Sequence, residues 1–470
     1  MIGIEKFFDY VSIFYIIYLI FYATFLWIGV ISGGYRLYQR NRMKKVQNEL
    51  RHKFYFPVSI LIPAYNEEVT IVDTVLSLMH LDYQLYEIIV IDDGSKDGTA
   101  QVLIDHFRME EVNRPIRKKI PCQTHEAIYE FKKGKVKLTL IKKKNGGKGD
   151  ALNMGINAAE SPYFLCMDAD SMLQKDSLEN IVKPLLENDK IVAVGGLVRI
   201  AQCVQIVRGE VTKDHLSWRP IIGVQVMEYM RSFFASRILL DHFNGNLIIS
   251  GSFGLFKKDI VIAVGGYATD TLGEDMEIVV KLHSFCRNNN IPYTIKYEPN
   301  AVCWSQAPTR LRDLITQRRR WHLGLLQCMI KYRQVFANSR YGMISAISYM
   351  YYLFYELLSP IIEVAGILII VLGCSIGLLN MKAMVQFFIL YTLYNILLTL
   401  TAFSQCAYVQ SLKLTWGDMF KALIMCVLEN VFFRYLISFT RVMAFIGYKK
   451  SKKTWGTIQR TAQNKVVERS

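Results

Sequence analysis

Two stretches decide the fold: VSILIPAYNEE at residues 58–68 and EIIVIDDGS at residues 87–95. Each is an apolar run that ends in a polar turn, which is the pattern of a buried strand, and residues 70–81 between them have helical spacing. Apolar runs at residues 138–142 and 163–167 repeat the strand pattern further along the chain. Strands that alternate with helices predict a doubly wound, mostly parallel α/β sheet.

Apolar segments lie on both sides of this α/β region. Residues 11–31 contain no charged side chain and are long enough to cross the ~30 Å hydrocarbon core of a bilayer. Three more apolar blocks follow at 343–379, 384–409 and 420–447. The first of these blocks is too long for one span and contains Ser359-Pro360, where a helix would break. The sequence therefore predicts one span before the α/β region and four after it, unless one block lies flat on the membrane.

The net charge of +16 is concentrated beside the apolar segments. Residues 36–53 and residues 449–470 each carry seven Lys or Arg and one Glu. Such basic flanks are typical of the cytosolic side of a membrane protein, so the charge indicates topology and not nucleic-acid binding. Glu5, Lys6 and Asp9 make the start unlike a cleaved signal peptide, so the first helix is expected to remain as an anchor.

The composition excludes several classes of protein. With 52% hydrophobic residues, the chain is neither disordered nor wholly soluble. Its nine cysteines are scattered without a CxxC motif, so they suggest neither a zinc site nor a disulfide framework.

These features predict six segments. They are an N-terminal transmembrane helix (1–34), a basic cytosolic linker (35–55), a cytosolic α/β domain (56–310), amphipathic interface helices (311–342), about four C-terminal transmembrane helices (343–448) and a basic cytosolic tail (449–470). Within the α/β domain, the highly charged residues 107–136 are expected to form an inserted, solvated loop.

Polar side chains follow the first two strands at the point where each strand ends. Tyr65 and Glu67 follow the first strand, and Asp92 and Asp93 follow the second. Because ligands of open α/β sheets bind at the carboxyl ends of the strands, these side chains are expected to line a nucleotide pocket. Taken singly, each turn is equally compatible with a helix cap.

Two further motifs point to a diphosphate and a metal ion. Lys148 lies in the glycine-rich turn GGKGD at 146–150, and Asp168 and Asp170 follow a later apolar strand. Two carboxylates at this spacing offer hard oxygen ligands to Mg2+ or Mn2+, and the cation would also hold a diphosphate. The sequence contains no Walker motif, which excludes a P-loop ATPase.

The order of these four motifs resembles glycosyltransferase family 2, with its GT-A fold, over residues 56–330. Three later motifs are ISGSFG at 249–254, GED at 273–275 and QRRRW at 317–321. The last motif is similar to the Q(Q/R)xRW signature of membrane-embedded processive synthases of cellulose, chitin, hyaluronan and poly-N-acetylglucosamine. The resemblance implies an α/β GT-A catalytic domain joined to an α-helical transmembrane region.

The same resemblance implies roles for individual residues. Asp275 would be the general base, with Glu274 beside it, because an acceptor hydroxyl needs a carboxylate to take its proton. The nucleotide would be bound by Tyr65, Glu67, Asp92, Asp93, Lys148, Asp168, Gln317 and Arg320, the metal by Asp168 and Asp170, and the acceptor by Ser250, Gly251, Ser252, Trp304 and Trp321. The alternatives are a helix cap at Glu274 and Asp275 and a solvated stripe of arginines at 318–320.

The C-terminal tail holds a weaker motif. Trp455, Gly456 and Thr457 resemble the WGT(R/K) element of hyaluronan and chitin synthases, in which a mobile loop covers the nucleotide. Ile458 stands in place of the basic residue, which leaves only Arg460 as a substitute. The tail is therefore interpreted as a gating element, with a disordered basic tail as the alternative.

The apolar blocks also contain charged residues. These are Glu356, Glu363, Glu429, Arg434 and Arg441. Charges at membrane depth usually face a protein interior or a wet pathway, so they indicate either a polymer channel or ion pairs between helices.

The leading hypothesis is a processive, inverting synthase in the cell membrane that polymerises a hexose from a UDP-sugar and translocates the glycan. UDP-glucose and a β-glucan, with mixed 1,3 and 1,4 linkages as one form, are favoured over UDP-N-acetylglucosamine and a poly-N-acetylglucosamine or hyaluronan-type product. A non-processive transferase onto a lipid is the other enzyme hypothesis. A transporter with a degenerate transferase domain is disfavoured because every expected acidic position is filled. The implied partners are the UDP-sugar, the growing glycan, membrane lipid and accessory secretion proteins.

Overall fold

The computed structural model describes residues 2–49, 56–207, 210–412 and 415–445. The strands are β1 (Val58–Ala64), β2 (Tyr86–Asp92), β3 (Glu110–Glu111), β4 (His125–Lys133), β5 (Val136–Lys143), β6 (Tyr163–Cys166), β7 (Met172–Leu173), β8 (Ile191–Ile200), β9 (Val204–Val207), β10 (Glu210–Asp214), β11 (Gly254–Lys257) and β12 (Thr294–Ser305). The α-helices are α1 (Ile2–Glu49), α2 (Ile71–Leu78), α3 (Thr99–Phe107), α4 (Lys148–Ala158), α5 (Ser177–Glu187), α6 (Pro220–Arg231), α7 (Arg237–Asp241), α8 (Lys258–Ala263), α9 (Glu274–Asn288), α10 (Leu311–Lys331), α11 (Ser359–Ser375), α12 (Met381–Val409), α13 (Trp416–Leu428) and α14 (Arg434–Phe445). Four π-helical segments are η2 (Ser232–Ser236), η5 (Ile344–Tyr349), η6 (Tyr352–Leu357) and η7 (Glu429–Phe433), and three 3-10 turns are η1 (Ala201–Cys203), η3 (Arg333–Val335) and η4 (Ser339–Tyr341).

A ten-stranded sheet forms the centre of the α/β part, in the order β3-β4-β5-β2-β1-β6-β11-β8-β12-β7. The pairings give seven strands one direction and leave β4, β11 and β7 reversed. The predicted mostly parallel α/β sheet is therefore confirmed. The reversal of β11 between β6 and β8 is a feature that the strand–helix alternation did not predict.

Both faces of the sheet are covered by helices, as the doubly wound prediction requires. Along β1, Ile60 and Ile62 pack with residues of α2, α3 and α5, whereas Leu61 packs on the other face with residues of α4 and α9. This alternation follows from the two-residue period of a strand. Ala64 pairs with Asp92 at the carboxyl ends of β1 and β2, so the two polar turns that follow begin side by side.

The insertion at residues 107–136 contains strands, contrary to the prediction of a solvated loop. β3 and β4 extend the sheet beyond β5 as antiparallel edge strands. Ile128 of β4 is buried in the middle of this edge, which the charged flanks of the segment obscure in the sequence.

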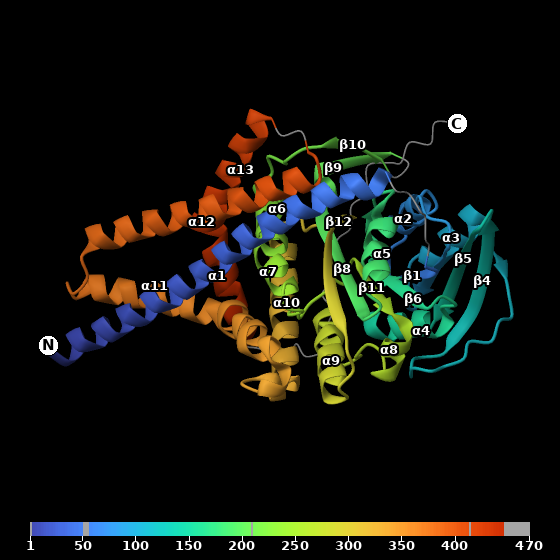
Figure 1. Ribbon diagram of the computed structural model, residues 1–470, viewed down its shortest axis with the longest axis horizontal. Helices are drawn as coiled ribbons and strands as arrows, with labels where there is room; N and C mark the ends of the chain where they lie inside the picture. The colour runs from blue at the N-terminus through green and yellow to red at the C-terminus, as the bar shows by residue number, and fades with distance from the viewer. Residues whose placement is uncertain (1, 50–55, 208–209, 413–414, 446–470) are drawn as a thin grey trace.

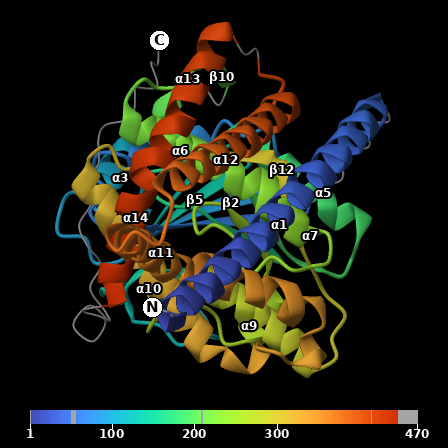
Figure 2. The ribbon, with the colours of Figure 1, turned by 90° about the vertical axis from the view of Figure 1, so that its left-hand side faces the viewer.

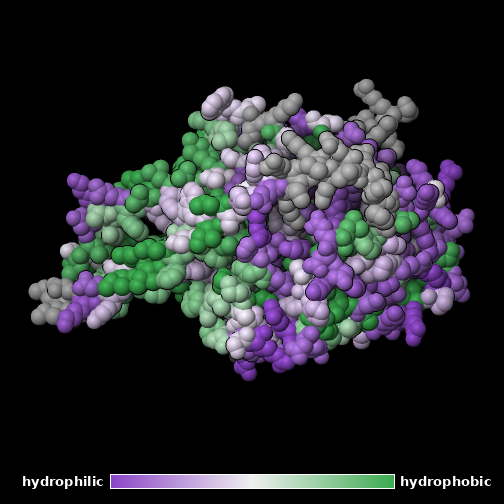
Figure 3. Space-filling view, viewed as in Figure 1, coloured by the Kyte–Doolittle hydropathy of each residue, from purple (hydrophilic) through white to green (hydrophobic). Residues whose placement is uncertain are grey.

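The apolar helices lie together on one side of the sheet. Figure 1 shows α1, α11 and α12 projecting away from the edge that carries β4, and Figure 2 views the molecule from their free ends. Hydrophobic side chains gather over these helices, and hydrophilic ones cover the α/β part (Figure 3). This distribution is that of a membrane-embedded region joined to a water-exposed domain.

The described residues offer three or four candidate spans, against the five that the sequence predicts. Helices at Lys6–Gln39, Met381–Val409 and Trp416–Phe445 are long and apolar enough to cross a membrane. The pair Ile344–Leu357 and Ser359–Ser375 is bent by 46° at the predicted break, and its two halves together make at most one more span. The first half is too short to cross alone, since ~30 Å of hydrocarbon needs about 20 helical residues.

The predicted basic linker at 35–55 is helical over most of its length. α1 continues without interruption to Glu49. Residues 35–49 contain neither Gly nor Pro and are rich in Arg, Lys and Gln, which favour a helix.

Candidate active site

One cavity of about 880 Å3 joins the α/β part to the membrane helices. Its wall begins at the turns after β1 and β2 and passes the first turn of α9 and one face of α10. It then continues between α1, α6, η6, α11, η7 and α14. Among the predicted site residues, those that line it are Tyr65, Glu67, Asp93, Lys148, Asp168, Asp170, Ser250, Gly251, Ser252, Glu274, Asp275, Gln317, Arg320 and Trp321.

The turns after β1 and β2 form the end of the cavity at which the nucleotide is expected. Tyr65 is half-exposed here, and buried Glu67 accepts a hydrogen bond from Thr70 at 2.8 Å. Asp93 pairs with Lys143 and accepts the backbone N–H groups of Gly146 and Gly147 at 3.0 and 2.7 Å. Asp93 therefore shapes the glycine-rich turn, and its protein contacts are those of a structural residue.

Asp92 does not line the cavity, contrary to its predicted place in the nucleotide pocket. The residue is buried and accepts the backbone N–H of Ser95 at 3.0 Å, which closes the turn after β2. Asp92 therefore stabilises a turn through a local bond from its side chain to the backbone, as Asp residues often do.

Lys148 is the first residue of α4 and lies among carboxylates. Its Nζ is 2.5 Å from Asp168 Oδ1 and 3.5 Å from Glu274 Oε1. Burial alone would lower the pKa of Lys148, but Asp168 and Glu274 together raise it above its ordinary value. The ammonium group is thus held charged at a helix N-terminus, where an anion is favoured.

Asp168 and Asp170 supply the two carboxylates expected to hold a metal ion, and both line the cavity. Ser252 donates to Asp168 Oδ2 at 2.7 Å, and Ser171 donates to Asp170 Oδ1 at 3.3 Å. The described residues contain no group of three or more His, Cys, Asp or Glu that could hold a metal without other ligands. Mg2+ commonly uses one or two carboxylates and completes its shell with substrate phosphates, so this donor set fits a metal–diphosphate complex.

The predicted base and its neighbour begin helix α9. Asp275 Oδ2 accepts the backbone N–H of Gly251 at 3.3 Å, and Asp275 Oδ1 accepts that of Met276 at 2.9 Å. A Cβ atom added at Gly251 would lie 2.9 Å from Lys148 Nζ and 3.4 Å from Asp275 Cβ, so the backbone of Gly251 packs closely against both side chains. Burial raises the pKa of Glu274, and the positive charge of Lys148 opposes that shift.

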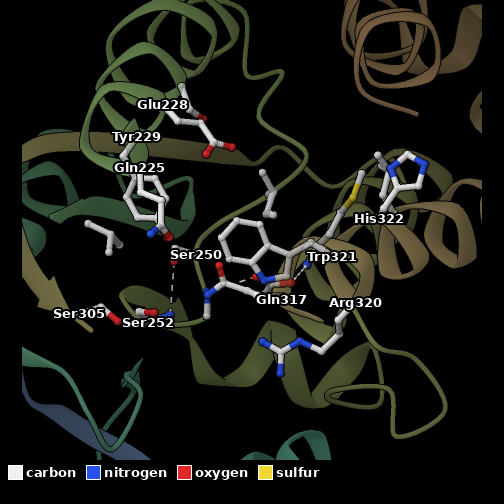
Figure 4. A pocket seen from close by; sticks show the side chains of 18 of the residues that line it. Gln225, Glu228, Tyr229, Ser250, Ser252, Ser305, Gln317, Arg320, Trp321 and His322 are labelled. Atoms are coloured by element: carbon white, nitrogen blue, oxygen red, sulfur yellow. Dashed lines mark hydrogen bonds between the residues drawn. The ribbon is translucent and has the colours of Figure 1, made fainter. Parts of the chain in front are cut away.

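Helix α10 reaches the base through a contact between two glycines. A Cβ atom at Gly324 would lie 2.8 Å from the backbone of Gly273, which precedes Glu274. The same helix presents Gln317, Arg320 and half-exposed Trp321 to the cavity (Figure 4). The Gly273–Gly324 contact therefore sets the spacing between the expected base and the expected acceptor platform.

Gly324→Ala is expected to lower the free energy of unfolding by about 1–3 kcal/mol, because a backbone-to-backbone contact cannot relax around a new methyl group. The transfer reaction that the sequence resemblance implies should slow as well, since α10 would move away from Asp275. Thermal unfolding and initial rates measure the two effects. Gly417→Ala is the matched control, because an added Cβ there meets nothing closer than 3.6 Å. Equal stability of both variants would show that α10 has room to shift.

Trp304, which is predicted to bind the acceptor, does not line the cavity. It is 1% exposed in β12 and packs against the Arg199 guanidinium, whose carbon lies 4.3 Å from the ring centroid. Its neighbour Ser305 lines the cavity in its place. The predicted gating residues Trp455, Gly456 and Thr457 lie outside the described residues.

The membrane end of the cavity contains residues that the sequence analysis did not assign to the site. Tyr18 and Tyr22 of α1 line it, together with two ion pairs. Arg231 Nη2 lies 2.5 Å from Glu429 Oε1, and Arg434 Nη2 lies 2.7 Å from Glu363 Oε1. The charged residues within the apolar blocks are the sequence feature that could have indicated these ion pairs, whereas nothing in the sequence distinguishes the tyrosines of α1.

Comparisons with known proteins agree with this geometry. Residues 163–446 match the family described as Glycosyl transferase family group 2, and residues 59–120 match Glycosyl transferase family 2. The poly-beta-1,6-N-acetyl-D-glucosamine synthases of Staphylococcus epidermidis and Staphylococcus aureus (strain COL) are 34% and 32% identical to the chain over 312 and 310 residues. Each match covers 65% of this chain and 64% of the relative, so it spans slightly less than two thirds of the relatives' length.

Among solved structures, the mannosyltransferase PcManGT from Pyrobaculum calidifontis, in complex with GDP-Man and Mn2+, matches with a TM-score of 0.49 and 17% identity. The match covers 92% of this chain and 98% of that one. This likeness is too low to support an inference about function.

Proposed function

The chain belongs to glycosyl transferase family group 2, and on that premise we propose that it is a membrane synthase that polymerises N-acetylglucosamine from UDP-N-acetylglucosamine into a β-linked glycan. The observation that carries the proposal is the single cavity. It joins the strand ends and Asp275 to ion pairs between membrane helices. A product that grows at Asp275 and leaves through the membrane end would need no second site.

The donor sugar in this proposal differs from the one that the sequence analysis favours. The resemblance favours UDP-glucose and a β-glucan, but the curated relatives are named poly-beta-1,6-N-acetyl-D-glucosamine synthases. We therefore propose N-acetylglucosamine as the transferred sugar and no longer favour a β-glucan as the product. The catalytic domain would lie on the cytosolic side of the cell membrane, where UDP-sugars are made.

The proposed chemistry is a single in-line displacement. Asp275 takes the proton of an acceptor hydroxyl, whose oxygen bonds to C1 of the donor sugar as the bond from C1 to the diphosphate oxygen breaks. The configuration at C1 is thereby inverted. Lys148 and Arg320 line the cavity and would stabilise the negative charge that develops on the departing UDP. Mg2+ or Mn2+ held by Asp168 and Asp170 would neutralise part of the same charge.

Asp168→Ala is expected to remove metal-dependent UDP binding, because it leaves a single carboxylate for the cation and removes the nearer of the two carboxylates beside Lys148. UDP affinity is measured by calorimetry with Mg2+ and with a chelator. Wild-type protein should bind at least about ten-fold more tightly with metal, a difference of about 1.4 kcal/mol. Asp189→Ala, at an exposed turn, is the control, and a metal effect that survives in Asp168→Ala would contradict the assignment.

The proposed function is tested with purified protein in nanodiscs, supplied with a divalent cation and with UDP-N-acetylglucosamine, UDP-glucose or UDP-glucuronate in turn. UDP release and digestion of the product with linkage-specific glycosidases identify the sugar and the bond. Polymer from UDP-N-acetylglucosamine alone supports the proposal. Polymer from UDP-glucose would restore the glucan hypothesis, and product that forms only with an added lipid acceptor would favour the non-processive transferase.

A further inference from the structure

A partly buried ion pair lies behind the ring of Trp321 and joins α10 to α6. Arg318 is fully buried, and its Nη2 lies 2.6 Å from Glu228 Oε2 of α6. The guanidinium carbon of Arg318 lies 4.3 Å from the centroid of the Trp321 ring. Nη1 of Arg318 donates to Gln317 Oε1 at 3.1 Å. The middle of the QRRRW motif therefore includes a buried arginine and is not the uniformly solvated stripe of the alternative interpretation.

These four side chains divide between the cavity and the protein interior. Glu228, Gln317 and Trp321 line the cavity, and Figure 4 shows them around the same opening, whereas Arg318 is behind the wall. Trp321 is 42% exposed although the Arg318 guanidinium covers one face of its ring. A planar guanidinium can stack on an indole and pair with a carboxylate at the same time, which an ammonium group cannot do.

We propose that Arg318 and Glu228 are a positioning pair for acceptor binding. Arg318 holds the indole of Trp321 with its other face toward the cavity, and Glu228 keeps Arg318 in that place. The second carboxylate oxygen of Glu228 accepts a hydrogen bond from a hydroxyl or amide N–H of the sugar that stacks on Trp321. This inference rests on the proposed function, because it requires that the cavity binds a glycan acceptor.

A purely structural pair would have a different signature. If the pair only joined α6 to α10, its loss would lower stability and every kinetic constant together. A positioning pair affects the ground-state binding of the acceptor, so its loss raises the acceptor KM and leaves UDP affinity and kcat nearly unchanged.

The test uses Arg318→Lys and Glu228→Gln in the full chain, with a β-linked N-acetylglucosamine oligosaccharide as the added acceptor. Each variant is expected to raise the acceptor KM roughly ten-fold, with kcat within about two-fold of the parent and UDP affinity unchanged. The double variant should raise KM by less than the product of the single effects, because the two residues act through one contact. Arg319→Lys makes the same chemical change one residue along α10, at a position that does not line the cavity, and should leave KM unchanged.

An unchanged acceptor KM in both folded single variants would overturn the inference, as would an equal rise in Arg319→Lys. If Arg318→Lys does not fold, Glu228→Gln decides the question alone, because it keeps the size of the side chain and a hydrogen-bonding oxygen. An unchanged KM in that variant again overturns the inference. Failure of the proposed function is a separate result, since the unmodified protein would then transfer no sugar to the oligosaccharide.

Discussion

The Asp275→Asn variant is expected to bind UDP as tightly as the parent chain and to transfer sugar roughly 1,000-fold more slowly, the order of effect that loss of a general base produces. Asparagine keeps the shape of the side chain, and its one amide oxygen can still accept the N–H of Met276 at the start of α9, while the amide NH2 replaces the oxygen that faces Gly251. The first turn of α9 should therefore be unchanged. Initial rates of UDP release and UDP affinity by calorimetry measure the two quantities.

Two further variants make this result specific. Asp189→Asn changes an exposed aspartate in the same way and should transfer sugar at the parent rate. Glu274→Gln removes the adjacent carboxylate, which is buried and 3.5 Å from Lys148, and should weaken UDP binding more than it slows the proton transfer. Near-normal polymer yield from Asp275→Asn would show that another group takes the proton. Loss of polymer synthesis in Glu274→Gln would then identify Glu274 as that group.

The Arg434→Leu variant is expected to lower the free energy of unfolding by about 3 kcal/mol, because it leaves Glu363 charged and without its cationic partner in a partly buried position. Ser438 would remain as a hydrogen-bond donor to Glu363 at 2.5 Å, but a hydroxyl carries no compensating charge. The midpoint of thermal unfolding in a single detergent measures the change. Lys382→Leu, on the exposed first turn of α12, is the control, because it also replaces a cationic side chain by leucine.

The double variant Glu363→Gln with Arg434→Leu separates stability from transport. Removing both charges should recover most of the lost stability, since the unpaired charge is the main cost. If polymer synthesis also recovers, the pair serves only to join α11 and α14. If stability recovers and polymer does not, the pair contributes to the path of the glycan. A single Arg434→Leu variant as stable as the parent would contradict the ion-pair argument itself.

Local patterns were sufficient to predict which residues line the cavity at the edge of the sheet. Tyr65 and Asp93 follow strands that pair in parallel, so the register of β1 and β2 brings their turns together without any further information. Lys148, Asp168 and Asp275 lie on other strand ends and helix starts of the same sheet edge, and all three line the cavity. Residues at the carboxyl ends of parallel strands converge for a reason that the sequence itself contains.

The residues that could not be predicted depend on details of register and packing. β12 has an irregular register between Glu298 and Val302, and a shift of one residue exchanges the two faces of a strand. The sequence therefore could not decide whether Trp304 or Ser305 faces the cavity. The contact of Arg318 with Glu228 could not be predicted either, because it depends on how the folded chain brings α6 beside α10.

The N-terminal helix has a consequence for chimeric proteins. Hydropathy describes α1 as an anchor, yet Tyr18 and Tyr22 form part of the cavity wall, and backbone carbonyls of α1 accept hydrogen bonds from Tyr394 and Gln405 of α12. An unrelated membrane helix of equal length and hydrophobicity would insert into the bilayer as readily as the native one. Such a helix would nevertheless change the shape of the cavity wall, so α1 cannot be replaced by another membrane helix without altering the cavity.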